Sequence, residues 1–304
     1  MGQHHDHGHH DHGHHDQASG HAARAFRWSI ALNSGLTALQ LVVGFGFGSL
    51  ALIGDALHNL GDVVGLGLGW GADQLSRRPA AGRFTYGYGR STQMASLLNG
   101  LLTFSAGVVV VVEAIQRLFN PVPLSVAPVA WAAAAGIGIN LLSARLFGHD
   151  HHHDLNQRAA VLHLLTDAAV SVAVLVSALL VGLTDWLWLD AVTAIGVGAA
   201  VIWSASGLLR EAVAINLDAA PRHVDLTQVE ATLAALPGVV EVEELHVWGL
   251  STSRTALTSH LLIDPAQLAS QRLKPNDLLT LARERLAALG IRTCTLQLED
   301  RPRP

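Results

Sequence analysis

Residues 50–62 read Leu-Ala-Leu-Ile-Gly-Asp-Ala-Leu-His-Asn-Leu-Gly-Asp, an apolar run that carries three ionisable side chains, Asp55, His58 and Asp62. This run lies in one of six stretches that hold almost no other charge. An α-helix of about 20 apolar residues crosses a hydrocarbon core about 30 Å thick. The sequence therefore predicts six transmembrane helices, over residues 27–48, 50–72, 92–114, 124–147, 159–182 and 187–209.

The composition agrees with a membrane protein. The chain has 304 residues, of which 50% are hydrophobic and 14% are charged, whereas soluble domains carry about a quarter charged residues. A soluble enzyme of this size is therefore nearly excluded. The net charge of −5 gives no reason to expect nucleic acid as a partner. The single cysteine, Cys294, excludes a disulfide framework and a thiolate metal cage.

Arginines are distributed unevenly between the two sides of the predicted spans. The loops on one side hold only Arg117, and basic residues beside spans stay in the cytoplasm. We therefore expect a multi-pass protein of the inner (cytoplasmic) membrane with both termini in the cytoplasm. The ten arginines that flank the spans on the cytoplasmic side are Arg24, Arg27, Arg77, Arg78, Arg83, Arg90, Arg145, Arg158, Arg210 and Arg222.

The last part of the chain has the pattern of a small soluble domain. Alternating apolar and polar residues at 239–243 are typical of a half-buried strand, and Pro237-Gly238 and Gly290 end helical stretches. The expected order is αββαβ, with helices at 225–236 and 275–289 and strands at 239–248, 255–263 and 291–299. The predicted fold class is thus a bundle of six transmembrane helices followed by a small cytoplasmic α/β domain.

These patterns divide the chain into four parts. We expect a transmembrane domain over 26–210 and the cytoplasmic α/β domain over 211–304. Residues 1–25 are expected to be a histidine-rich disordered tail in the cytoplasm, and residues 148–156 a histidine-rich cytoplasmic loop.

Histidines are concentrated in the tail and in this loop. Nine of the 18 lie in the first 21 residues, and four more lie at His149, His151, His152 and His153. Runs of histidine with aspartate are compositional signals of metal binding. Such segments would capture divalent metal ions such as zinc loosely and raise their concentration on the cytoplasmic side, or they are disordered and without effect.

The ionisable residues inside two predicted spans point to a metal site. His58 and Asp62 are four residues apart, as are His163 and Asp167, so each pair projects from one helix face. Two imidazoles and two carboxylates form a tetrahedral ligand set suited to zinc. The alternative is a buried polar network that only holds the bundle together. Asp55, on the same face as His58, fits a carboxylate that supports a ligand, a relay carboxylate on the exit side of the site, or a packing partner.

Together these motifs resemble the cation diffusion facilitator family, and most of all its bacterial zinc-efflux and cobalt-zinc-cadmium-resistance branch. The resemblance implies a homodimeric antiporter that exports zinc in exchange for protons, with a cytoplasmic domain of metallochaperone-like fold. In the family, histidine at the position of His58 goes with a preference for zinc over cadmium. The residues that carry the resemblance are 49–62, Arg83-Phe-Thr-Tyr-Gly-Tyr-Gly-Arg90, Asn99-Gly100, Asn156 with Arg158, and His163-Leu-Leu-Thr-Asp167.

Exchange of zinc for protons is consistent with the chemistry of these ligands. Zinc binds neutral histidine and ionised carboxylate, so arrival of the metal expels protons and returning protons compete with it. The ordinary pKa of histidine, about 6.5, places this exchange in the physiological range. Other divalent metals, such as cadmium and cobalt, are alternative cargoes.

The resemblance also implies candidate sites in the cytoplasmic domain. His246, His260 and Glu299 match positions where family members carry metal ligands or their neighbours. Two interpretations stay open: the domain is regulated by zinc, or it is a purely structural dimerisation module.

Other classes of function account for the sequence less well. His58-Asn-Leu-Gly-Asp62 also fits the HNxxD motif of ZIP importers, but the chain lacks their HExxH motif and has six spans where they have eight. An intramembrane zinc hydrolase needs a general-base glutamate, and the only glutamate of the spans is Glu113, near an end. An ATP-driven pump would need a phosphate-binding GxxxxGK[ST] loop. A membrane-anchored metal buffer leaves the paired HxxxD motifs unexplained.

Overall fold

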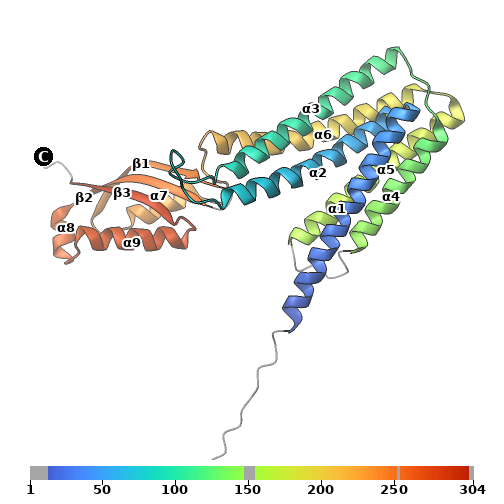
Figure 1. Ribbon diagram of the computed structural model, residues 1–304. Helices are drawn as coiled ribbons and strands as arrows, with labels where there is room; N and C mark the ends of the chain where they lie inside the picture. The colour runs from blue at the N-terminus through green and yellow to red at the C-terminus, as the bar shows by residue number, and fades with distance from the viewer. Residues whose placement is uncertain (1–12, 147–154, 252–253, 301–304) are drawn as a thin grey trace, which may run out of the picture. The chain divides into compact units, whose positions relative to one another are not determined.

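The computed structural model describes residues 13–146, 155–251 and 254–300, and of residues 13–27 and 155–157 it describes the backbone alone. The chain divides into two compact units, each treated separately below. Unit 1 comprises residues 1–64 and 102–204, and unit 2 comprises residues 65–101 and 205–304. The six long helices, shown in Figure 1, are α1 (Gly13–Phe47), α2 (Leu50–Ser76), α3 (Ser91–Phe119), α4 (Val126–Leu146), α5 (Leu155–Thr184) and α6 (Trp188–Asn216).

Five of these helices contain segments long and apolar enough to cross a membrane: Trp28–Phe47, Ser91–Phe119, Val126–Leu146, Arg158–Thr184 and Trp188–Asn216. The sixth predicted span, 50–72, lies in α2, which is a helix of 27 residues but is not among the five. Its six glycines and the side chains of Asp55, His58, Asp62 and Asp73 lower its mean hydropathy. Length and composition therefore support five of the six predicted spans. The exception is α2, the helix that carries the predicted metal ligands His58 and Asp62.

Two boundaries differ from those predicted. Helix α1 begins at Gly13, whereas the predicted span began at residue 27, so the helix starts within the stretch 1–25 that we expect to be a disordered tail. Alanine and arginine at positions 22–24 are good helix formers, and extending a helix costs much less than nucleating one. Helix α6 continues to Asn216, past the predicted domain boundary at 210. The histidine-rich residues 1–12 and 149–153 lie outside the described residues, so their capture of zinc stays a prediction.

Unit 1 is a helical bundle with an apolar core. Helix α4 packs against α5 and α1, and α4 and α5 form an antiparallel pair (Figure 1). Helices α3 and α6 approach very closely at Gly107 and Gly198, where a Cβ on either glycine would lie 3.2 Å from the carbonyl oxygen of the other. Small residues of this kind allow close helix packing in membranes. The core residues come from all of α2 to α6 and include Leu52, Val110, Val129, Val174 and Ala194.

In unit 2 the C-terminal α/β domain has a three-stranded sheet in the order β1-β2-β3. Strands β1 and β2 are antiparallel, and β2 and β3 are parallel. The elements are α7 (Leu226–Ala234), β1 (Val239–Gly249), β2 (Thr255–Ile263), α8 (Pro265–Ser270), α9 (Pro275–Ala288) and β3 (Thr293–Asp300). The predicted fold class, a helical membrane domain with a small α/β domain, is confirmed.

The domain has a core of its own, in which leucines of the helices pack against leucines of the sheet. Leu233 of α7 and Leu286 of α9 are fully buried with Leu257 and Leu261 of β2. The short helix α8 was not expected from the sequence. Its signal is the pair Asp264-Pro265: the Asp264 carboxylate accepts hydrogen bonds from the backbone N–H groups of the first turn, and proline is favoured at the first helical position.

Candidate metal site

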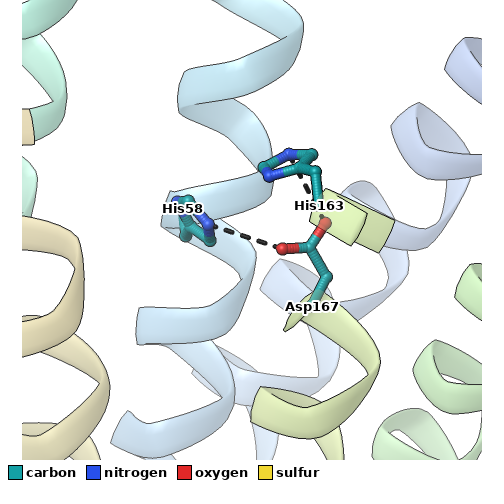
Figure 2. Close-up of side chains that lie close together, drawn as sticks. All are labelled: His58, His163 and Asp167. Atoms are coloured by element: carbon teal, nitrogen blue, oxygen red, sulfur yellow. Dashed lines mark ion pairs between the residues drawn. The ribbon is translucent and has the colours of Figure 1, made fainter. Parts of the chain in front are cut away.

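The four side chains predicted as zinc ligands meet between α2 and α5, within unit 1. His58 Nε2 lies 3.5 Å from Asp167 Oδ1. His163 Nε2 lies 3.0 Å from Asp62 Oδ2 and 3.6 Å from Asp167 Oδ2. Figure 2 shows the Asp167 carboxylate between the two imidazoles. Each histidine is thus paired with a carboxylate of the opposite helix.

Three of the four form a compact group. One ligand atom from each of His58, His163 and Asp167 can be chosen so that all lie within 4.8 Å of one another. Asp62 lies outside this group but contacts His163. Ligand atoms about 2.0 Å from a zinc ion lie about 3.3 Å apart at the corners of a tetrahedron. The contacts of 3.5 Å, 3.0 Å and 3.6 Å given above are close to that value, so the geometry is compatible with a shared ion at His58, His163 and Asp167.

The two pairs differ in exposure. The side chains of His58 and Asp167 are 16% and 2% exposed, whereas those of His163 and Asp62 are 47% and 39% exposed. Asp62 comes after His58 along α2, and His163 comes before Asp167 along α5. The more exposed pair, His163 and Asp62, therefore lies toward the carboxyl end of α2, and the buried pair, His58 and Asp167, lies deeper in the bundle.

Asp55 does not join the group of three and instead holds α2 against its neighbours. It is fully buried and accepts hydrogen bonds from Gln40 Nε2 of α1, at 2.7 Å, and Ser171 Oγ of α5, at 2.9 Å. Asn59 Nδ2 donates to Gln40 Oε1 at 3.3 Å. On α4, Gly136 leaves room for this network, because a Cβ there would lie 2.8 Å from Ser171 Oγ. Of the three roles expected for Asp55, these contacts favour that of a supporting carboxylate.

Asn140 on α4 is a further buried polar residue, and sequence reasoning missed it. It is fully buried, and neither of its amide atoms has a hydrogen-bond partner among the residues described. Asn140 lies one turn after Gly136, and Asp167 lies one turn before Ser171. Because α4 and α5 are antiparallel and Gly136 faces Ser171, Asn140 lies at the level of Asp167. A polar residue inside a predicted span is the signal that could have found it.

The beginning of α2 is held in place by Asp190 of α6, a residue that is distant from it in the sequence. Asp190 of α6 accepts hydrogen bonds from Ser49 Oγ at 2.6 Å and from the Leu50 backbone N–H at 2.7 Å. A carboxylate at this place caps the free N–H groups of the first turn. Arg117 Nη1 donates to the Gly48 carbonyl at 2.7 Å. These contacts set the position of α2, and hence of His58 and Asp62, relative to α3 and α6.

The candidate ligands of the C-terminal α/β domain lie on three strands. His260 of β2 forms an ion pair with Glu299 of β3, with 2.8 Å between Nδ1 and Oε1, and its Nε2 lies 3.7 Å from Glu244 Oε2. His246 of β1 pairs in register with Thr258, two residues before His260 along β2. Within the described part of the domain, no group of three such ligand atoms is as compact as the one in the membrane domain. Metal binding by these residues stays a prediction.

The same domain holds the only cysteine of the chain. Burial raises the pKa of the Cys294 thiol, which lowers its thiolate fraction and its affinity for metals at neutral pH.

A bundle of apolar helices with imidazoles and carboxylates grouped inside it, followed by a small α/β domain, is the architecture of a multi-pass membrane transporter for cations. Two family models match nearly the whole chain: the cation efflux transmembrane domain over residues 27–215, and the cation efflux protein cytoplasmic domain over residues 221–300. The chain belongs to the cation efflux family, which confirms the resemblance drawn from its motifs. It is a transporter and not an enzyme.

Several characterised proteins are similar along most of their length. The metal cation efflux system protein CzcD of Cupriavidus metallidurans is 33% identical over 243 residues, which cover 80% of this chain and 77% of CzcD. The zinc transporter ZitB of Escherichia coli is 34% identical over 245 residues, covering 80% and 78%. A cadmium, cobalt and zinc/H⁺-K⁺ antiporter of Bacillus subtilis is 28% identical over 273 residues, covering 89% and 87%.

Proposed function

We propose that this protein exports zinc from the cytoplasm in exchange for protons, by alternating access, and that His58, Asp62, His163 and Asp167 form the transport site. The observation that carries the proposal is the compact group of His58, His163 and Asp167 inside the bundle, with Asp62 at 3.0 Å from His163. Two nitrogens and two oxygens suit tetrahedral zinc. The similarity to a zinc transporter and to a zinc/H⁺-K⁺ antiporter supports it.

The arrangement suggests how protons are coupled to the metal. In both histidines, Nε2 is the atom that lies next to a carboxylate, and it would also be the atom that binds zinc. A proton on this nitrogen is held by the adjacent carboxylate, and the nitrogen cannot then bind a metal ion. Zinc and protons therefore compete for the same two nitrogens, which is the requirement for exchange of one for the other.

The difference in exposure gives a direction of entry. The exposed pair, His163 and Asp62, lies toward the carboxyl end of α2, which the distribution of arginines assigns to the cytoplasm. Zinc entering from the cytoplasm would meet these two ligands first. It would then reach the buried pair, His58 and Asp167, from which an outward-open form would release it.

We infer the remaining features from the same observations. The ten arginines on one side support an inner-membrane location with both termini in the cytoplasm. The match of residues 221–300 to the family's cytoplasmic domain supports assembly of two chains through that domain. Cadmium and cobalt, which appear in the name of the Bacillus subtilis relative, are the second candidate cargo.

The test is transport by the full chain reconstituted in liposomes, with zinc and pH indicators inside and with zinc or cadmium outside. We expect zinc-dependent proton movement, and we expect Asp167→Asn to slow zinc transport more than about tenfold because it removes a ligand without changing shape. Asp73→Asn is the matched control, since Asp73 is an exposed carboxylate that pairs with Arg77. Zinc transport by Asp167→Asn at the rate of the control would overturn the site, and binding without transport would favour a metal buffer.

A further inference from the structure

The connection between α2 and α3, residues 77–90, is an ordered part of unit 2. Ala81 and Phe84 form an antiparallel β-bridge, in which the backbone N–H of each donates to the carbonyl of the other. The Gly87 N–H also donates to the Phe84 carbonyl, at 3.0 Å. The hydroxyl of Ser91, at the start of α3, donates to the Ala72 carbonyl near the end of α2 at 2.8 Å. These contacts close the connection into a fixed surface at the ends of two long helices.

This surface concentrates positive charge in a chain whose net charge is −5. Arg77 pairs with Asp73, and Arg90 pairs with Asp218. Within the ranges that the structure describes, Arg78, Arg83 and Arg254 form no ion pair with a carboxylate. Three uncompensated guanidinium groups therefore remain around one short connection.

The arginines line cavities instead of standing on a flat surface. A cavity of about 540 Å³ is bordered by Arg78 and Arg254 together with Thr85. Its shape depends on Gly89, because a Cβ at that position would lie 2.6 Å from the Leu250 carbonyl oxygen and 2.8 Å from Arg254 Nη2. Glycine thus lets Arg254, which follows β1, reach the connection between α2 and α3.

An adjoining cavity of about 400 Å³ adds apolar walls. It is lined by Arg83 and by Phe84, Tyr86 and Met94, whose side chains are 55%, 63% and 56% exposed. Thr85 and Tyr86 line both cavities. Exposed aromatic side chains at the end of an apolar helix are typical of the zone between hydrocarbon and lipid headgroups.

We propose that these two cavities bind the headgroup of an anionic phospholipid. Guanidinium groups bind phosphate oxygens in pairs of parallel hydrogen bonds, and unpaired arginines are the groups available for this. Basic pockets at the cytoplasmic ends of membrane helices recognise anionic headgroups. Arg78, Arg83 and Arg254 take the phosphate, and the exposed Phe84, Tyr86 and Met94 contact the beginning of the acyl chains.

The test uses the full chain in neutral detergent, with bound lipid measured by native mass spectrometry. The probes are dioleoyl phosphatidylglycerol, dioleoyl phosphatidylcholine and inorganic phosphate. We expect saturable binding of phosphatidylglycerol at least about tenfold tighter than that of phosphatidylcholine. The triple variant Arg78→Gln, Arg83→Gln and Arg254→Gln should lose that preference, whereas the triple Arg→Lys variant, which keeps the charge and loses the paired hydrogen bonds, should retain part of it.

The matched control removes the same charge from other cytoplasmic span ends, in the triple variant Arg145→Gln, Arg158→Gln and Arg210→Gln. It should bind phosphatidylglycerol as the unaltered chain does. Equal loss in both glutamine variants would show a general charge effect and overturn the site. Equal binding of the two lipids, or displacement of phosphatidylglycerol by inorganic phosphate at the same concentration, would overturn the lipid assignment.

Discussion

Gln40 of α1 contacts the supporting carboxylate Asp55, and this contact can be removed with little change in shape. Gln40→Leu takes away the 2.7 Å hydrogen bond to a buried carboxylate, which costs about 1.5–3 kcal/mol. We expect the midpoint of thermal unfolding in detergent to fall by several degrees, at about 2–4 °C per kcal/mol.

Gln116→Leu is the control for this prediction, because Gln116 is exposed on α3. Tryptophan fluorescence during heating measures both variants. Unfolding of Gln40→Leu at the temperature of the control would mean that the network around Asp55 contributes nothing to the fold.

Asn140 provides a second prediction, which concerns zinc affinity. Because Asn140 lies at the level of Asp167, we expect its amide to hold that carboxylate in place when zinc binds. Removing a group that orients a ligand weakens metal binding by about 10–100-fold. Asn140→Leu should therefore bind zinc at least about tenfold more weakly in calorimetric titration, whereas Asn120→Leu, at an exposed position after α3, should bind as the unaltered chain does. Unchanged affinity of Asn140→Leu would contradict the role.

The predicted metal ligands and the buried polar residues that sequence analysis missed differ in how far apart in the sequence the interacting residues lie. His58, Asp62, His163 and Asp167 could be identified because each pair lies within four residues of one helix. Gln40 and Asp190 act across helices, and the contacts from Asp190 to Ser49 and Leu50 span about 140 positions of sequence. The sequence marks them only as polar residues inside apolar spans, without indicating their partners.

At the scale of the element, the junction between α1 and α2 depends on Gly48. Its φ of +82° is in the region that favours glycine, and a Cβ would lie 2.6 Å from the Pro123 carbonyl oxygen. Gly48→Ala should destabilise the protein by about 1–3 kcal/mol and slow zinc transport, because the beginning of α2 moves.

The matched substitution is Gly46→Ala. Gly46 lies in α1, where a Cβ would meet no atom within 4 Å, and alanine is the better helix former. We expect this variant to be as stable as the unaltered chain or more so. Thermal unfolding and liposome transport compare the two, and equal behaviour of both alanine variants would mean that the junction tolerates rearrangement.

Hydropathy predicted the five strongly apolar helices well, and it was a weaker guide to α2, the helix that carries two of the predicted metal ligands. The five apolar spans and the order of the cytoplasmic domain follow from local pattern. Helix α2 is long and continuous, yet it is not among the five segments that are apolar enough to cross a membrane, and it carries six glycines and the carboxylates of Asp55, Asp62 and Asp73. The start of α1 was missed for a different reason, since helix propagation from an apolar segment into a polar one leaves no signal in hydropathy.

For the whole molecule, competition between zinc and protons predicts a pH dependence. Both His58 and His163 must lose a proton at Nε2 to bind zinc, so zinc affinity should fall as the pH falls. From pH 7.5 to pH 6.0 we expect a decrease of about tenfold. Titration of the full chain with zinc at both pH values measures this.

The variant His260→Ala tests where this dependence originates. His260 belongs to the cytoplasmic domain and pairs with Glu299, so the variant should retain the pH dependence. Its disappearance would place the competing protons in the cytoplasmic domain, and a pH-independent affinity in the unaltered chain would contradict exchange at the site.

The contact between Gly107 and Gly198 has a mechanical consequence. With their backbones this close, α3 and α6 have no layer of side chains between them that could rearrange at that point. Sliding one helix along the other would bring larger side chains against the carbonyl groups that the glycines now face. The two helices should therefore move as one rigid body at this level during a transport cycle, which leaves the polar faces of α1, α2, α4 and α5 as the surfaces that change partners.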